Sequence, residues 1–220
     1  EDLDGFFSGW NPDDRVYEPA PKGRFDVIEL RTTFAGRPDQ RLFLRKGELG
    51  GNQLITFGYQ GPDDALFANL TEPAGEQGTL VVSMDGETKE IDAKESMGKP
   101  VPVGKRTVTI REVFRSLTIG AGGKPEENPA LPDGNPAAVF DVTAGDRTES
   151  FYAFALMPER TPMRRGTGMH QGEGPGFAAS FRCPPRLSRV WIFGYPDGLR
   201  YVLTTLKGVT KSGPFAIGSS

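Results

Sequence analysis

The sequence predicts an all-β protein, an antiparallel β-sandwich-like domain with long loops rich in glycine and proline. Three observations support this prediction. Short segments in which apolar and polar residues alternate recur along the chain. Turn-forming residues separate these segments at intervals of about 8–12 residues. Glycine and proline, with 29 and 19 residues among 220, punctuate many short elements.

Three dipeptides mark the clearest hairpins. Asp85-Gly86, Gly145-Asp146 and Asp197-Gly198 each lie between two alternating segments, and such dipeptides favour tight turns between antiparallel strands. We therefore expect hairpins centred on these positions. A further hairpin is expected between residues 24–34 and 41–49, which also alternate.

Residues 105–114 form the most regular strand pattern. The alternation assigns Val108, Ile110 and Val113 to the core and turns Arg111 towards solvent.

Elsewhere the pattern predicts loops and little helix. Long loops are expected at residues 118–137 and 158–176, where glycine and proline recur too often for a strand ladder. Residues 64–70 are interpreted as a strand after a turn at 61–64. The best helix candidate is 92–99, which is long enough for about one or two turns.

The domain organisation follows from the same pattern. Residues 1–23 mix aromatic residues with aspartate, proline and glycine, so we expect an extended N-terminal arm. Residues 24–220 then form the sandwich-like domain, which can also be divided into β subdomains near 24–77 and 78–220. The chain begins at Glu1 without a signal-peptide pattern, and we expect any membrane anchor to lie outside it.

Charge and composition argue against some classes of function. The formal net charge is -3 and no long basic run occurs, so nucleic-acid binding is not expected. Cys183 is the only cysteine, so an intrachain disulfide cannot form. No phosphate-binding loop, catalytic pair or calcium loop is recognisable. The acidic pairs Asp13-Asp14, Asp63-Asp64 and Glu126-Glu127 are interpreted as solvated turn residues. We expect no enzyme activity.

His170 is the only histidine, and it lies in the glycine-rich segment 166–172. It is interpreted as a loop or packing residue. The alternative is a haem ligand, with the neighbouring Met169 or Met163 as a sulfur ligand. We expect that the isolated chain binds neither haem nor a metal ion, so no cofactor is assigned.

Aromatic residues alternate along the hairpin near residue 197. Trp191, Phe193, Tyr195 and Tyr201 could form a platform for sugar binding, but such residues more often make the core face of a sandwich. We expect Trp191 and Phe193 in the core.

Two arginines of the same hairpin are assigned to the surface. We expect Arg189 at a solvated strand end and Arg200 on the opposing arm pointing to solvent.

The order of motifs between Gly78 and Pro185 resembles the extracytoplasmic domain of ResB-like cytochrome c biogenesis proteins, in particular divergent planctomycete-type members. The similar segments are GTLVVSMDGETKEI, GKPVPVGKRTVTIREVFRSL, Asn-Pro-Ala before AVFDV, and FYAFALMPERTPMRRGTGMHQG. The late segment LRYVLTTLKGVTKSGPFAIG is also similar. Where that family has His-Gly, Gln171 separates the histidine from the glycine in this chain. Residues 1–77 show no similarity to the family.

This resemblance implies a non-catalytic extracytoplasmic scaffold or docking domain of a membrane protein, with a role in cytochrome c maturation and haem delivery. It implies a periplasmic location and membrane-protein partners, or parent transmembrane segments, outside residues 1–220. The family's haem ligands belong to its membrane-embedded parts, so none is transferred to this chain. The alternative is a carbohydrate- or small-ligand-binding β-sandwich module of an exported protein.

Overall fold

The computed structural model is mostly β-structure arranged in mainly antiparallel sheets, which confirms the predicted fold class. It describes residues 2–10, 17–19, 27–32, 40–47, 49–51, 56–120, 124–130, 134–165, 176–185, 188–205 and 211–215. The chain divides into two compact units: unit 1 is Glu1–Asp64 with Arg186–Ser220, and unit 2 is Ala65–Pro185. Among the described residues, no helix combines the length and the apolar composition needed to cross a membrane.

Unit 1 is built from two sheets. Its strands are β1 (Asp2–Trp10), β2 (Tyr17–Pro19), β3 (Val27–Thr32), β4 (Gln40–Arg45), β5 (Leu49–Gly51), β6 (Thr56–Gln60), β17 (Arg189–Tyr195), β18 (Gly198–Thr204) and β19 (Lys211–Phe215). The strand orders are β2-β1-β3-β4 and β19-β18-β17-β6-β5. The two sheets share one apolar cluster, formed by Ile28, Leu30, Leu44, Phe57, Tyr59, Val190, Ile192 and Leu199.

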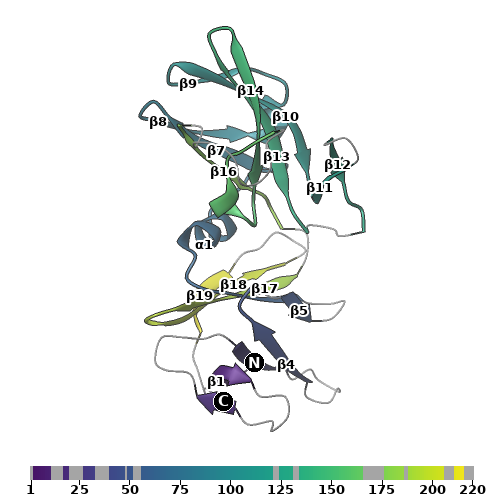
Figure 1. Ribbon diagram of the computed structural model, residues 1–220, viewed down its shortest axis with the longest axis vertical. Coiled ribbons are helices and arrows are strands. Elements are labelled where there is room, and N and C mark those ends of the chain that lie inside the picture. The colour runs from purple at the N-terminus through teal and green to yellow at the C-terminus, as the bar shows by residue number, and fades with distance from the viewer. Residues whose placement is uncertain are drawn as a thin grey trace. The chain divides into compact units, whose positions relative to one another are not determined.

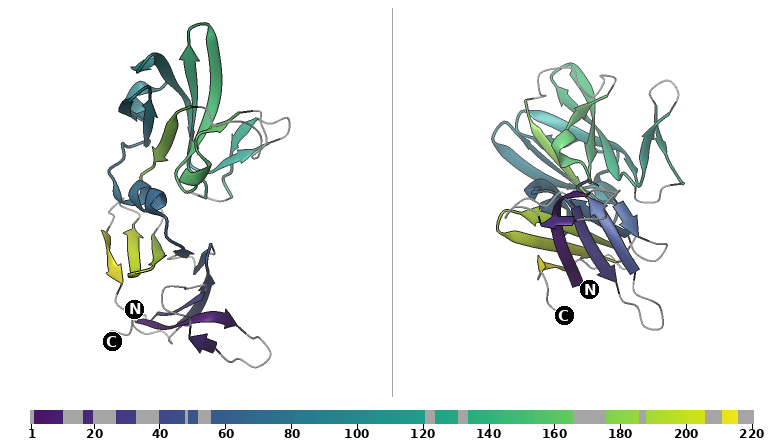
Figure 2. Two further views of the ribbon diagram at one scale, coloured as in Figure 1. Left: turned by 60° about the vertical axis from the view of Figure 1, so that its left-hand side comes forward. Right: turned by 60° about the horizontal axis from the view of Figure 1, so that its bottom comes forward.

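Unit 2 is a two-sheet sandwich with a short ribbon. Its elements are α1 (Asp64–Thr71), whose first residue belongs to unit 1, β7 (Thr79–Met84), β8 (Glu87–Asp92), α2 (Ala93–Ser96), β9 (Val101–Val103), β10 (Arg106–Phe114), β11 (Leu117–Ile119), β12 (Pro125–Glu127), β13 (Ala137–Ala144), β14 (Arg147–Phe154), the 3-10 helix η2 (Pro158–Arg160), β15 (Met163–Arg164) and β16 (Ala178–Arg182). The sheets have the orders β16-β7-β8 and β15-β14-β13-β10-β9, and β11 pairs with β12. Figure 1 and the left panel of Figure 2 show the β13–β14 hairpin extending beyond its neighbours in unit 2.

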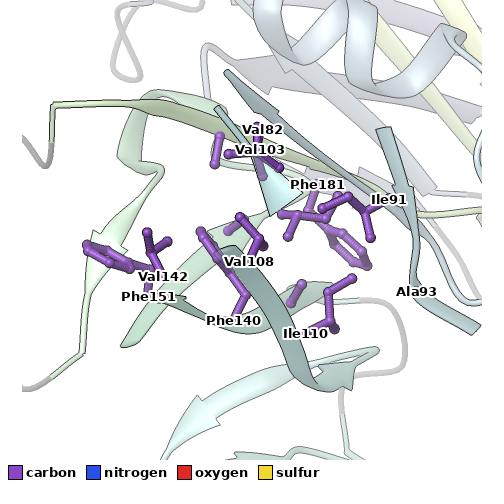
Figure 3. Close-up of a cluster of buried hydrophobic side chains, with 14 of the residues drawn as sticks. Val82, Ile91, Ala93, Val103, Val108, Ile110, Phe140, Val142, Phe151 and Phe181 are labelled. Carbon is purple, nitrogen blue, oxygen red and sulfur yellow. The ribbon is translucent and has the colours of Figure 1, made fainter. Parts of the chain in front are cut away.

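The core of unit 2 lies between its two sheets (Figure 3). The ring of Phe140 on β13 is fully buried and stacks on Phe151 of β14, with ring centroids 5.8 Å apart. Phe181 on β16 is also fully buried and fills the space beside Gly78. A Cβ at residue 78 would lie 2.3 Å from the Phe181 ring, so this position requires glycine.

Unit 2 is inserted into the sequence of unit 1. Strands β6 and β17 are parallel neighbours in one sheet, and parallel neighbours need a long crossover connection. Here residues 61–188 make that connection, and they contain the whole of unit 2. The sequence suggested a division near residue 77 instead. The alternation of apolar and polar residues could not reveal the insertion, because the strands of both units show it.

Arg182 joins the beginning and the end of unit 2. Its side chain is 5% exposed, and it lies three residues before the end of the unit. One terminal nitrogen lies 2.9 Å from a carboxylate oxygen of Glu72 and donates to the carbonyl of Pro73 at 3.2 Å. The other terminal nitrogen pairs with Glu90 on β8. The buried guanidinium therefore connects the start of unit 2 with its end.

The hairpins predicted from turn dipeptides are present. Asp85 and Gly86, with φ values of 52° and 81°, form the two-residue turn between β7 and β8, as expected for a primed turn. Gly145-Asp146 joins β13 to β14. The β17–β18 turn consists of Pro196-Asp197, one residue earlier than the predicted centre, because Gly198 already pairs with Tyr195. The hairpin of β3 and β4 also forms.

A β-bulge in β10 explains the position of Val113. The pairing with β13 shifts between Ile110 and Glu112. The side chains that face inward are therefore at even-numbered positions before the bulge and at odd-numbered positions after it. Val108 and Ile110 before the bulge are buried, and Val113 after it packs against the same core. Arg111, at the bulge, lies on the opposite face as predicted, since it pairs with the outward-facing Asp141.

Residues 64–71 form helix α1, so the strand predicted at 64–70 is wrong. Asp64 in the first turn is favourable near the positive end of the helix dipole, and the alanines and leucines that follow are strong helix formers. Leu66 is buried. The segment is too short to display a helical period, which is why alternation misled the prediction.

The loop predicted at residues 118–137 contains paired strands. β11 pairs with β12 in an antiparallel ribbon, and the carboxylate of Glu127 accepts hydrogen bonds from the backbone N–H groups of Arg115 and Ser116 at 2.9 and 2.7 Å. Glu127 is exposed, as expected, but it lies in a strand and binds backbone groups instead of lying in a turn. Proline at the start of β12 is compatible with an edge strand of a two-stranded ribbon.

Two other segments also differ from the expected loop and arm. Within 158–176, the described residues include η2 and β15. Within 1–23, β1 pairs with both β2 and β3, so its backbone is part of a sheet and is not a separate arm. The helix candidate at 92–99 contains α2, where the Asp92 side chain accepts from the N–H of Glu95.

Replacing Phe140 by Ala should lower the free energy of unfolding by about 3–5 kcal/mol, because it removes a fully buried ring and leaves a cavity. Urea unfolding followed by circular dichroism measures this loss. Phe43→Ala is the matched control, since Phe43 is 41% exposed and its truncation should cost much less. Equal losses for the two variants would contradict the assigned core.

Candidate functional site

His170 and Met169 lie outside the described residues, so the structure does not test them as ligands. The residues before and after their segment are described. On one side, β15 pairs with β14, and the N–H of Arg165 donates to the carbonyl of Ser150 at 2.8 Å. On the other side, β16 pairs with β7. The chain therefore enters and leaves this segment from unit 2.

Met163, the third candidate ligand, lies beside an apolar cluster on the outer face of the five-stranded sheet. We call this the outer cluster; it consists of Phe114, Leu117, Ala137, Val139, Tyr152 and Phe154. Tyr152 and Phe154 stack with ring centroids 6.2 Å apart, and Met163 is half-buried against the cluster. Packing against aromatic rings is a common role for methionine, and the structure gives Met163 this role.

Charged groups border the outer cluster. Burial raises the pKa of the Tyr152 hydroxyl above its ordinary value, while the positive charge of Arg165 lowers it and the negative charge of Glu112 raises it. Arg165 and Glu112 are both exposed. The cluster is thus an apolar patch of the sheet with one cation and one anion near the Tyr152 hydroxyl.

A polar network occupies the same face of the sheet nearer the hairpin turn. Asp141 on β13 has a side chain only 11% exposed, although aspartate is unfavourable within a strand. Its two oxygens accept hydrogen bonds from the Ser150 hydroxyl at 2.5 Å and from Nε of Arg111 at 2.7 Å. Both carboxylate oxygens are therefore engaged, which suits a stabilising ion pair better than a proton acceptor.

Cys183 also has a defined partner. Its Sγ accepts a hydrogen bond from one terminal nitrogen of Arg115 at 2.6 Å, and the other nitrogen donates to the carbonyl of Pro184 at 2.8 Å. Cys183 is half-buried against the core of unit 2. Arg115 thus holds the last residues of the unit, a contact between distant residues that no local sequence pattern indicates.

The aromatic hairpin does not form an exposed platform. Trp191 and Phe193 are buried, as predicted, and Tyr195 is buried as well. Arg189 is only 8% exposed, so its predicted position in solvent is wrong. Its guanidinium lies 5.3 Å from the Trp191 ring. Strict alternation places residue 189 on the face of residue 191, and stacking on the indole accommodates the charge there.

Arg200 covers the end of this hairpin. Its guanidinium lies over the Tyr195 ring, 4.1 Å from the centroid, and pairs with Asp197 at 3.0 Å. Its side chain remains 42% exposed. Tyr201, the fourth aromatic residue of the predicted row, is half-buried.

The Tyr195 hydroxyl donates a hydrogen bond to Asp64 at 2.9 Å. Asp64 is the first residue of α1 and belongs to unit 1, as Tyr195 does, so this contact lies within unit 1. Burial, reinforced by the hydrogen bond to Asp64 and its charge, raises the pKa of Tyr195 to about 12. Asp64 is exposed, as expected for an acidic pair, but it lies in the first turn of a helix and accepts this hydrogen bond.

No group of three or more histidine, cysteine, aspartate or glutamate side chains suited to a metal ion occurs among the described residues. Comparisons with profiles of known protein families, with curated protein sequences and with solved structures gave no match. The polar and apolar features of unit 2 are therefore interpreted from their geometry.

Tyr195 should ionise about two pH units above an ordinary tyrosine. Below about pH 10 both the folded and the unfolded chain keep this proton, so it adds no pH dependence there. Between about pH 10 and 12 the unfolded chain loses the proton first, so the free energy of unfolding falls as pH rises.

Absorbance at 295 nm during a pH titration measures this ionisation among the five tyrosines. Tyr195→Phe should lower the amplitude of the late-titrating component by one tyrosine, while Tyr152, whose pKa burial also raises, still contributes to it. A late component of unchanged amplitude in Tyr195→Phe would contradict the assignment.

Proposed function

We propose that this chain is a non-catalytic scaffold or docking domain of an extracytoplasmic membrane-protein assembly that acts in bacterial cytochrome c maturation. The observation that carries the proposal is a coincidence of boundaries. The main segment with the ResB-like resemblance runs from Gly78 to Pro185, and it lies within unit 2, Ala65–Pro185, and ends at the same residue.

The similar motifs between Gly78 and Pro185 are also the structural elements of one sandwich, whereas the late similar segment LRYVLTTLKGVTKSGPFAIG includes most of β18 and all of β19 in unit 1. GTLVVSMDGETKEI spans the β7–β8 hairpin, KRTVTIREVF spans β10, and AVFDV lies in β13. FYAFAL includes the end of β14. Strands from all these motifs contribute to one buried cluster. A self-contained module inserted in a second β unit is suited to presenting a surface to a partner.

The sugar-binding alternative depended on an exposed row of aromatic side chains. Trp191, Phe193 and Tyr195 are buried instead, and Arg189 and Arg200 stack on two of these rings. A sugar stacks on an exposed ring face, which these residues do not offer. The docking role is therefore the better supported proposal.

The proposal implies that the isolated chain binds haem no more than weakly. Haem titration of the purified chain should give no submicromolar change in the Soret band, because the chain has a single histidine and no C-x-x-C-H haem-attachment motif. His170→Ala should behave like the parent chain. A submicromolar complex that disappears in His170→Ala would contradict this expectation and make the segment around residue 170 a haem site.

Deleting residues 65–185 in the source bacterium should lower covalent attachment of haem to c-type cytochromes, which haem-stained gels measure. Unit 2 is compact and its two ends are connected by an ion pair, so the deletion removes a complete module. An immunoblot of the tagged parent protein in the membrane verifies that it is still made. The surface variant Arg147→Gln serves as a control and should retain normal levels. Normal c-type cytochromes with unit 2 absent would refute the proposed role.

A further inference from the structure

We draw no further inference here: the strongest candidate, the exposed end of the β11–β12 ribbon of unit 2, where Ile119 is 49% exposed opposite Pro125, carries none because nothing in the described part of the structure shows what covers it.

Discussion

The ion pairs of Arg182 are the contact on which the organisation of the chain depends. This buried guanidinium binds Glu72 and Pro73 at the start of unit 2 and Glu90 within it, while Arg182 itself lies near the end. A unit whose two ends are held together can be inserted into another without separating the strands of its host. Here the host strands β6 and β17 remain hydrogen-bonded neighbours although a whole unit separates them in sequence.

The two faces of the larger sheet in unit 2 have different roles. The inner face packs Phe140 and Phe151 into the sandwich core. The outer face combines the Asp141 network with the outer cluster. The bulge in β10 lies at Arg111, whose side chain pairs with Asp141 on this outer face. These features give unit 2 a packed core and a chemically mixed outer surface. A docking domain needs both properties, since a preorganised surface loses less entropy on binding.

Local patterns predicted the hairpins because turn geometry depends on neighbouring residues, as at Asp85-Gly86. Features that depend on distant residues were missed. Glu127 organises the β11–β12 ribbon by binding backbone groups across the loop, and Arg189 is buried because Trp191 offers a ring face. Helix α1 is too short to show a period. Of the candidate ligands, only Met163 is among the described residues, and its packing against the outer cluster could not be read from alternation.

The most direct test of this account is the folding of residues 65–185 as an isolated polypeptide. An inserted unit with its own core, closed by Arg182, should give a dispersed amide NMR spectrum and a single cooperative unfolding transition. Arg182→Met should lower the midpoint of that transition, because Glu72, Glu90 and the Pro73 carbonyl lose their shared donor. A polypeptide that remains unfolded, or that unfolds without cooperativity, would contradict the claim that unit 2 is a self-contained module.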